Sequence, residues 1–155
     1  MNPQIKILNR KEKKEIEKKT EKQFGIKSLP YLLFQTNKGK IRGYSGNLSR
    51  EEIQTLLKTV NIEINGIYLF NLEQDGQLRI SHDAVSLFKD KITKNIIEIN
   101  EEQADKFLHG EDIYIDDQET KSIVVLKFQD NLVGSGKLSQ GRITNFVPKE
   151  RRLKN

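Results

Sequence analysis

The chain has 155 residues, enough for one domain or two small ones, and a chain of this length needs no disulfide or metal to hold its core. It contains no cysteine, which excludes disulfides, thiolate metal sites and cysteine nucleophiles. With 32% charged and 35% hydrophobic residues, it has no apolar run of the ~18–20 residues that a spanning helix needs, so we expect no membrane partner. The N-terminus shows no apolar signal segment, and we expect a cytoplasmic protein.

The net charge of +5 conceals an uneven distribution along the chain. Residues 1–30 carry a net charge of +5, residues 31–120 a net charge of −6, and residues 121–155 a net charge of +6. If the two basic ends lie on one face, they form an electrostatic footprint for a polyanion. Solvated lysine-rich helices and tails explain the same charges equally well, so charge alone does not decide between these interpretations.

The first predicted element is a helix over residues 9–24. Asn9 is a suitable N-cap, Glu12 occupies the capping-box position, and Gly25 ends the helix. Because this helix has few apolar residues, we expect it to be mostly solvated, with one narrow edge packed against the protein.

A hairpin and a second helix follow in the predicted order. Residues 31–34 and 41–44 are the strands of the hairpin, and Ser49 caps the second helix. The helical spacing of four apolar residues predicts that they face the core: Ile53, Leu56, Leu57 and Val60. A strand over residues 62–72 is then expected to turn at Asp75–Gly76 into a second strand.

The polar segment at residues 89–95 is typical of a domain boundary, so we predict two domains, 1–92 and 93–155. The second domain is predicted to begin with a short strand and a helix over residues 101–108, capped by Asn100. Several short strands follow, with the turn spacing of a small barrel. The expected class is α+β: a small N-terminal α/β domain with antiparallel hairpins and a C-terminal β pseudo-barrel with one helix.

Three blocks of the second half form a recognisable pattern. They are FLHGEDI at residues 107–113, VVLKF followed by NLVGSGK over residues 124–137, and GRITNFVPKERR at residues 141–152. This pattern resembles the PUA family, an RNA-binding pseudo-barrel, and above all the PUA-type domain appended to RNA cytosine-5 methyltransferases. Thr144 stands where that group usually has lysine. The N-terminal part is more weakly similar to the domain that precedes PUA in a ribosome-biogenesis factor.

The resemblance implies a glycine-lined, basic RNA-binding surface. Its candidate residues are Lys127, Gly134, Gly136, Lys137, Arg142, Asn145, Lys149, Arg151 and Arg152. Gly134 and Gly136 alternate on one strand, which is consistent either with a smooth strip for a sugar-phosphate backbone or with a bend in the barrel. Asn145 could bond to a base edge or a phosphate, or be a satisfied structural amide. The basic tail could instead be a solvated end.

Aromatic residues and histidines provide few further candidates for a binding or catalytic site. Tyr44, Tyr68 and Tyr114 could stack on bases, although core or interface packing is the favoured explanation. His82 lies beside Asp83, but no nucleophile converges on the pair in sequence. We therefore expect no catalytic residue, no cofactor and no metal site, and in particular no methyl transfer by this polypeptide.

These observations predict a non-catalytic RNA-binding protein that acts on structured rRNA or tRNA in RNA modification or ribosome biogenesis. The alternative is a protein adaptor in a pre-ribosomal or RNA-modification complex that recruits a separate modifying enzyme or assembly factor. The net negative charge of residues 31–120 favours the adaptor, because an acidic surface repels RNA and is free to bind other proteins.

Overall fold

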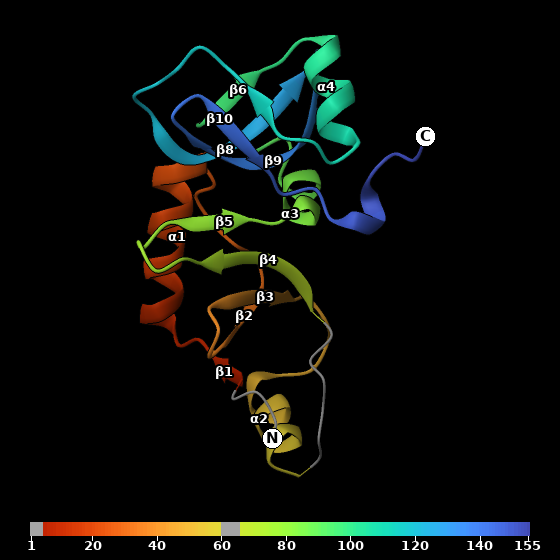
Figure 1. The fold of residues 1–155 in the computed structure, drawn as a ribbon. Coiled ribbons are helices and arrows are strands. Elements are labelled where there is room, and N and C mark those ends of the chain that lie inside the picture. The colour runs from red at the N-terminus through yellow and green to blue at the C-terminus, as the bar shows by residue number, and fades with distance from the viewer. Residues whose placement is uncertain (1–4, 60–65) are drawn as a thin grey trace.

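The computed structural model describes residues 5–59 and 66–155, and these form two five-stranded sheets (Figure 1). Sheet A belongs to the N-terminal half and has the strand order β1-β2-β3-β4-β5. The elements of this half are β1 (Ile5–Ile7), α1 (Arg10–Phe24), β2 (Leu32–Thr36), β3 (Lys40–Tyr44), α2 (Arg50–Thr59), β4 (Ile67–Leu72) and β5 (Leu78–Ile80). All neighbouring strands in it are antiparallel, as the predicted hairpins require.

Sheet B belongs to the C-terminal half and has the order β6-β8-β9-β10-β7. Its elements follow α3 (His82–Leu87) and are β6 (Ile96–Glu98), α4 (Glu101–Leu108), β7 (Ile113–Tyr114), β8 (Lys121–Phe128), β9 (Asn131–Ser139), β10 (Arg142–Asn145) and the 3-10 helix η1 (Lys149–Arg151). Strand β6 is parallel to β8, and the other pairs are antiparallel. The predicted α+β class is confirmed.

Helix α1 begins and ends where its residues predict. The Asn9 side chain accepts the backbone N–H of Glu12 at 2.8 Å, and Gly25 ends the helix in the left-handed conformation at φ 81°. Only Ile16, Thr20 and Phe24 are buried, so one narrow edge packs, as expected. Over residues 5–59 and 66–155, no helix is long and apolar enough to cross a membrane.

The register of β3 against β4 shifts between Ile41 and Arg42. Ile41 pairs with Phe70, whereas Arg42 pairs with Tyr68, so Leu69 is an extra residue in β4. As a result Leu69 and Phe70 are both buried although they are consecutive. The bulge places Tyr68 beside Arg42, on the face of sheet A opposite to Phe70.

Helix α2 packs less closely than its spacing predicts. Ile53 is buried against Ile7 and Phe34 in a small cluster of its own, but Leu56 and Leu57 remain partly exposed. Leu57 still packs against this cluster, so the prediction that these apolar residues face the core is wrong only for Leu56 among the described ones, because α2 covers only the β1–β2 end of the sheet. Val60 and residues 62–65 of the expected strand lie outside the described residues.

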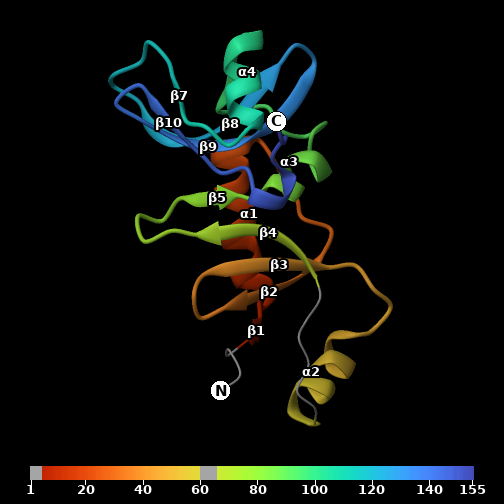
Figure 2. The same cartoon turned by 45° about the vertical axis from the view of Figure 1, so that its right-hand side comes forward.

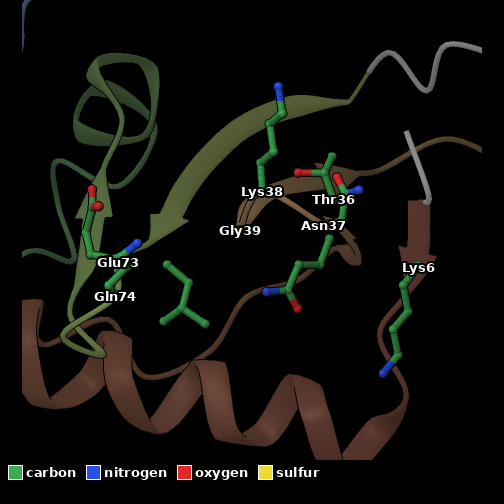
Figure 3. A pocket seen from close by; sticks show the side chains of 9 residues that line it. Lys6, Thr36, Asn37, Lys38, Gly39, Glu73 and Gln74 are labelled. Atoms are coloured by element: carbon green, nitrogen blue, oxygen red, sulfur yellow. The ribbon is translucent and has the colours of Figure 1, made fainter. Parts of the chain in front are cut away.

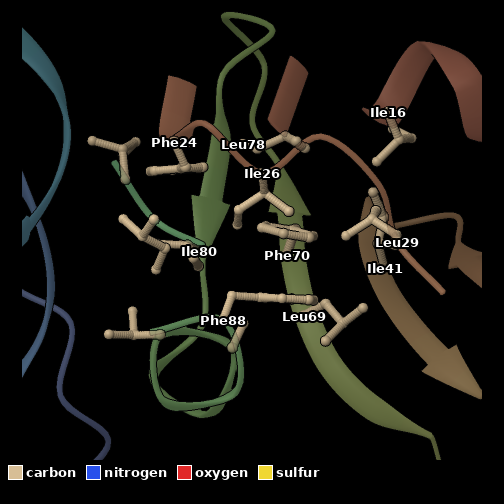
Figure 4. Packing of buried hydrophobic residues seen from close by; sticks show 14 of the residues in the cluster. Ile16, Phe24, Ile26, Leu29, Ile41, Leu69, Phe70, Leu78, Ile80 and Phe88 are labelled. Carbon is tan, nitrogen blue, oxygen red and sulfur yellow. The ribbon is translucent and has the colours of Figure 1, made fainter. Parts of the chain in front are cut away.

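One hydrophobic core continues through both halves. The rings of Phe24 and Phe88 stack on Phe70, with centroids 6.5 and 6.4 Å away (Figure 4). Ile123 and Val125 of β8 belong to this same core, although they come from the other sheet. The core thus runs across residue 92, the boundary that the polar segment predicts.

A second hydrophobic core lies between helix α4 and sheet B. Phe107 of α4 lies in it, together with Val124 and Leu126 of β8. Residues of β8 therefore alternate between the two cores, which fixes the two halves against each other. The buried hydroxyl of Ser135 donates to the Ile80 carbonyl at 2.8 Å and adds a polar contact to the same junction.

Candidate nucleic-acid interface

Gly134 and Gly136 lie inside the protein, not on its surface. A Cβ on Gly136 would come within 2.6 Å of both the Ile143 side chain and the Thr144 carbonyl oxygen. A Cβ on Gly134 would lie 2.9 Å from the ring of Phe107. The prediction of an open glycine strip for RNA is wrong, because strand β9 uses these glycines to let α4 and β10 approach closely.

The Asn145 side chain is a structural amide. Its Nδ2 donates to the carbonyls of Phe107 at 2.7 Å and Glu111 at 2.8 Å, and its Oδ1 accepts the Val147 N–H at 2.8 Å. These bonds tie the end of β10 to the end of α4 and the loop after it. Since both of its N–H groups already have partners, Asn145 does not present a free edge to a base.

Asp112 occupies the next position around the same junction. Its Oδ1 accepts the Asn145 backbone N–H at 2.9 Å, and its Oδ2 accepts Nε and Nη2 of the Arg142 guanidinium. These bonds hold the pKa of the Asp112 carboxyl below its usual range; the bond from the Asn145 backbone has the largest effect, and the bond from Arg142 comes next. Arg142 is thus neutralised by an internal partner rather than left for a phosphate.

We expect Asp112→Asn to reduce stability most at neutral pH. A carboxyl with a lowered folded-state pKa stabilises the protein above its unfolded-state pKa, and this contribution disappears as pH falls through the folded-state pKa. Urea unfolding of both proteins between about pH 7 and about pH 3 measures this difference. A stability difference that grows on acidification would contradict the assignment.

The C-terminal tail stays largely exposed, as the alternative of a solvated end requires, but three contacts dock it on the protein. Arg152 Nε donates to the Val147 carbonyl at 3.1 Å, and the Leu153 N–H donates to the Leu108 carbonyl at 2.8 Å. Arg151 Nη2 lies 3.1 Å from Asp83 Oδ1, with both side chains about half exposed. The tail therefore joins the ends of α3 and α4, and its two arginines are engaged within the chain.

His82 is packed between the same elements. Its Nδ1 is buried, with no hydrogen-bond partner among the described residues. Burial is the main cause that lowers the pKa of its imidazole, and Asp83 opposes this shift. Because the Asp83 carboxylate pairs with Arg151, it does not orient His82 as the acid of a catalytic pair would.

Three of the nine predicted residues are cations with neither a salt bridge nor a side-chain hydrogen bond within the described part of the chain: Lys127, Lys137 and Lys149. Lys137 follows Ser135 at a two-residue interval on β9, so it shares the face of sheet B that is turned toward sheet A. Lys149 is exposed on η1, and Lys127 lies near the far end of β8. The nine residues do not form one patch.

The two basic ends of the chain also lie apart. Helix α1 packs along sheet A, where Lys19 donates to the Gly76 carbonyl at 3.0 Å. The tail packs against α3 and α4, on the other side of the molecule in Figure 1. The charges of α1 and the tail therefore do not add up to one continuous face.

Sequence reasoning missed a group of basic and aromatic side chains on sheet A. Lys40, Arg42 and Tyr68 share one face of β3 and β4, and Arg79 follows on β5. Of the three tyrosines considered, Tyr114 is 68% exposed and Tyr44 packs on Phe34. The signal for this group is weak in the sequence, because the bulge at Leu69 interrupts the alternation of β4.

A polar groove on sheet A offers no comparable site (Figure 3). It lies between the β2–β3 and β4–β5 turns, and Lys6 and Lys38 supply its cations. Lys6 Nζ is 2.9 Å from Glu12 Oε2, and Glu73 adds a second carboxylate to the lining. With one cation paired and another carboxylate beside it, the groove has no net attraction for an anion.

Comparison with known proteins gives three related results. Residues 94–153 match the family model described as Methyltransferase RsmF PUA domain. The chain is 30% identical over 132 residues to the ribosomal RNA small subunit methyltransferase F of Psychromonas ingrahamii. The aligned region makes up 83% of this chain and 26% of that protein. The enzyme of the same name from Citrobacter koseri is 28% identical over 99 residues, 64% of this chain and 20% of that protein. The chain spans about a quarter or less of the length of these relatives.

The similarity is not confined to the C-terminal half, since 132 aligned residues are more than residues 94–153 can supply. A crystallised PUA domain from Aeropyrum pernix K1 shares the fold over 99% of this chain and 88% of that chain, with a TM-score of 0.54 and 14% sequence identity. The predicted pseudo-barrel is thus confirmed as a PUA fold. This chain is a PUA-domain protein whose C-terminal half resembles the PUA domain of ribosomal RNA cytosine methyltransferases.

Proposed function

We propose that this chain is a non-catalytic RNA-binding protein that acts in the cytoplasm on structured rRNA or tRNA, in RNA modification or ribosome biogenesis. The match of residues 94–153 to the PUA domain of a ribosomal RNA methyltransferase carries the proposal. The free cations Lys127, Lys137 and Lys149 on that domain are consistent with it, because lysine ammonium groups neutralise phosphates.

Titration of the protein into fluorescently labelled tRNA and small-subunit rRNA hairpins tests the proposal. If three lysines contact phosphates of a duplex, affinity should fall about 40-fold between about 50 and about 200 mM salt. Failure to bind either RNA at the lower salt concentration would overturn it.

Lys137→Gln combined with Lys149→Gln is expected to weaken hairpin binding and to lower the slope of log affinity against log salt by about 1.8. The melting temperature should change by less than about 2 °C, because neither lysine has a salt-bridge partner among the described residues. Lys11→Gln with Lys14→Gln is the charge-matched control, since both lysines are exposed on α1. Equal loss of affinity in the control would indicate a non-specific effect of net charge.

The adaptor role is the second candidate, and the groove between α4 and β7 favours it. Glu102 and Glu111 line this groove beside Lys106, and Tyr114 projects from it. An acidic groove with an exposed aromatic ring repels RNA but suits a basic protein segment. Partners that a nuclease-treated pull-down recovers with the wild type, and loses with Tyr114→Ala, would support this role.

A further inference from the structure

The outer face of sheet A carries a row of basic and aromatic side chains, and all of them except Phe146 lie outside the residues that match the PUA family model. We define this outer face as Lys40, Arg42, Tyr68, Asn71, Arg79 and Phe146. Figure 2 shows α1 behind β4 and β5, so that the core lies on that side and the outer face lies on the other. All six residues are half-buried, with part of each side chain open to solvent.

Strand pairing makes this row continuous. Arg42 lies opposite Tyr68, Lys40 lies opposite Asn71, and Asn71 lies opposite Arg79. Directly opposed residues share a face and approach closely, so the row crosses three strands without a gap. It exists because the bulge at Leu69 turns Tyr68 away from the core.

The cations of the outer face are held next to the aromatic rings. Lys40 Nζ lies 4.8 Å from the centroid of the Tyr68 ring, and the Arg79 guanidinium lies 3.7 Å from the centroid of the Phe146 ring. Arg42 donates to the Gly66 carbonyl at 2.9 Å, which fixes its guanidinium above β3. Within the described residues, one carboxylate, that of Glu73, lies close enough to influence Tyr68, against the two cations Arg42 and Arg79.

The outer face continues onto the PUA half. Phe146 follows β10 and packs against the shared core, while Arg79 comes from β5, so their contact bridges the two sheets. Lys137 pairs with Thr144 and shares the face that is turned toward sheet A. Its charge therefore lies on the PUA side of the same junction.

We propose that the outer face of sheet A binds a single-stranded segment of RNA that extends from a structured RNA held by the PUA half. This inference rests on the proposed function. Lys40 and Arg42 would contact phosphates, while Tyr68 and the Arg79 guanidinium would stack on bases, because aromatic rings and planar guanidinium groups both stack on unpaired bases. An acidic peptide would also meet the cations, but its carboxylate side chains carry no aromatic ring to stack on these surfaces.

Two labelled RNA hairpins test the inference: one with blunt ends and one with a single-stranded overhang of about 12 nucleotides. The wild type should bind the overhang hairpin at least about fivefold more tightly than the blunt one. Lys40→Gln with Arg79→Gln should abolish this advantage, and it should lower the salt slope for the overhang hairpin by about 0.7, because Lys40 is the phosphate contact that it removes. Tyr68→Leu should reduce the advantage with no change in charge.

The controls separate this inference from the proposed function. Lys11→Gln with Lys14→Gln should keep the overhang advantage, whereas Lys137→Gln with Lys149→Gln should weaken binding of both hairpins. Normal binding of the blunt hairpin with no overhang advantage in the wild type would overturn the inference alone. No binding of either hairpin would overturn the proposed function as well. Displacement of the overhang hairpin by polyglutamate as effectively as by single-stranded RNA would assign the outer face to an acidic protein partner instead.

If Tyr68→Leu fails to fold, the double variant of Lys40 and Arg79 still decides the question. Thermal melting by circular dichroism verifies that this double variant is folded. An overhang advantage that survives in the folded double variant contradicts the inference.

Discussion

Asn145→Ala is expected to lower the free energy of unfolding by about 2–4 kcal/mol, which corresponds to a fall in melting temperature of about 10 °C for a chain of this size. The substitution removes three hydrogen bonds and leaves the Glu111 carbonyl and the Val147 N–H without their partner, whereas the Phe107 carbonyl keeps the Gly110 N–H at 3.0 Å. All three groups lie where β10 meets α4. Urea unfolding followed by circular dichroism measures the effect.

Asn131→Ala is the matched control, because Asn131 is exposed at the start of β9. It should change stability by less than about 0.5 kcal/mol. The alternative role predicted for Asn145 was contact with a base or a phosphate. If Asn145→Ala left stability unchanged and weakened RNA binding, that role would be correct and the structural one wrong.

The helix boundaries could be predicted because caps are local. Asn9, Ser49 and Asn100 each accept a backbone N–H three residues ahead, and each was predicted as an N-cap. The interaction needs only a short polar side chain before the helix, so no knowledge of the rest of the fold is required. The hairpins were accessible for the same reason, since their turns join neighbouring strands.

The fate of the candidate site residues could not be predicted in this way. Arg142 meets Asp112 thirty positions away, and Asn145, at the end of the same strand, meets Phe107 38 positions away. Both polar side chains look available in sequence because their partners are distant. Only the order of strands in sheet B brings α4, β7 and β10 together and decides that these groups serve the fold.

The polar segment at residues 89–95 illustrates the same limit. Its composition is typical of a linker, but the Thr93 N–H donates to the Phe24 carbonyl at 2.8 Å, and Asn95 Nδ2 donates to the Gln23 carbonyl at 2.6 Å. The segment thus caps the end of α1. Polar residues satisfy backbone carbonyls at a helix end as readily as they satisfy water, so composition does not distinguish these cases.

The outer face of sheet A escaped prediction because of one extra residue. Strict alternation along β4 would place Tyr68 and Phe70 on the same face, and hence Tyr68 in the core. The bulge reverses the orientation of the residues before it. A register shift of this kind depends on the pairing partner in β3, which periodicity within β4 does not reveal.

Gly136→Ala is expected to destabilise the protein by about 2–3 kcal/mol, because the new methyl group would lie 2.6 Å from the Thr144 carbonyl oxygen. Strand β10 would have to move away from β9, and with it the Asn145 and Asp112 contacts. Thermal and urea unfolding measure the loss, and Ser139→Ala, half-exposed on the same strand, serves as the control.

The same variant separates packing from RNA contact. If Gly136 serves only the close approach of β9 and β10, the folded Gly136→Ala protein should bind the blunt RNA hairpin at low temperature with an affinity within about threefold of the wild type. Unchanged stability with a large loss of affinity would instead restore the glycine strip as an RNA surface. Gly136 is buried, and Ile143 and backbone atoms lie where a side chain would have to fit. We therefore expect Gly136→Ala to lose stability rather than affinity for RNA.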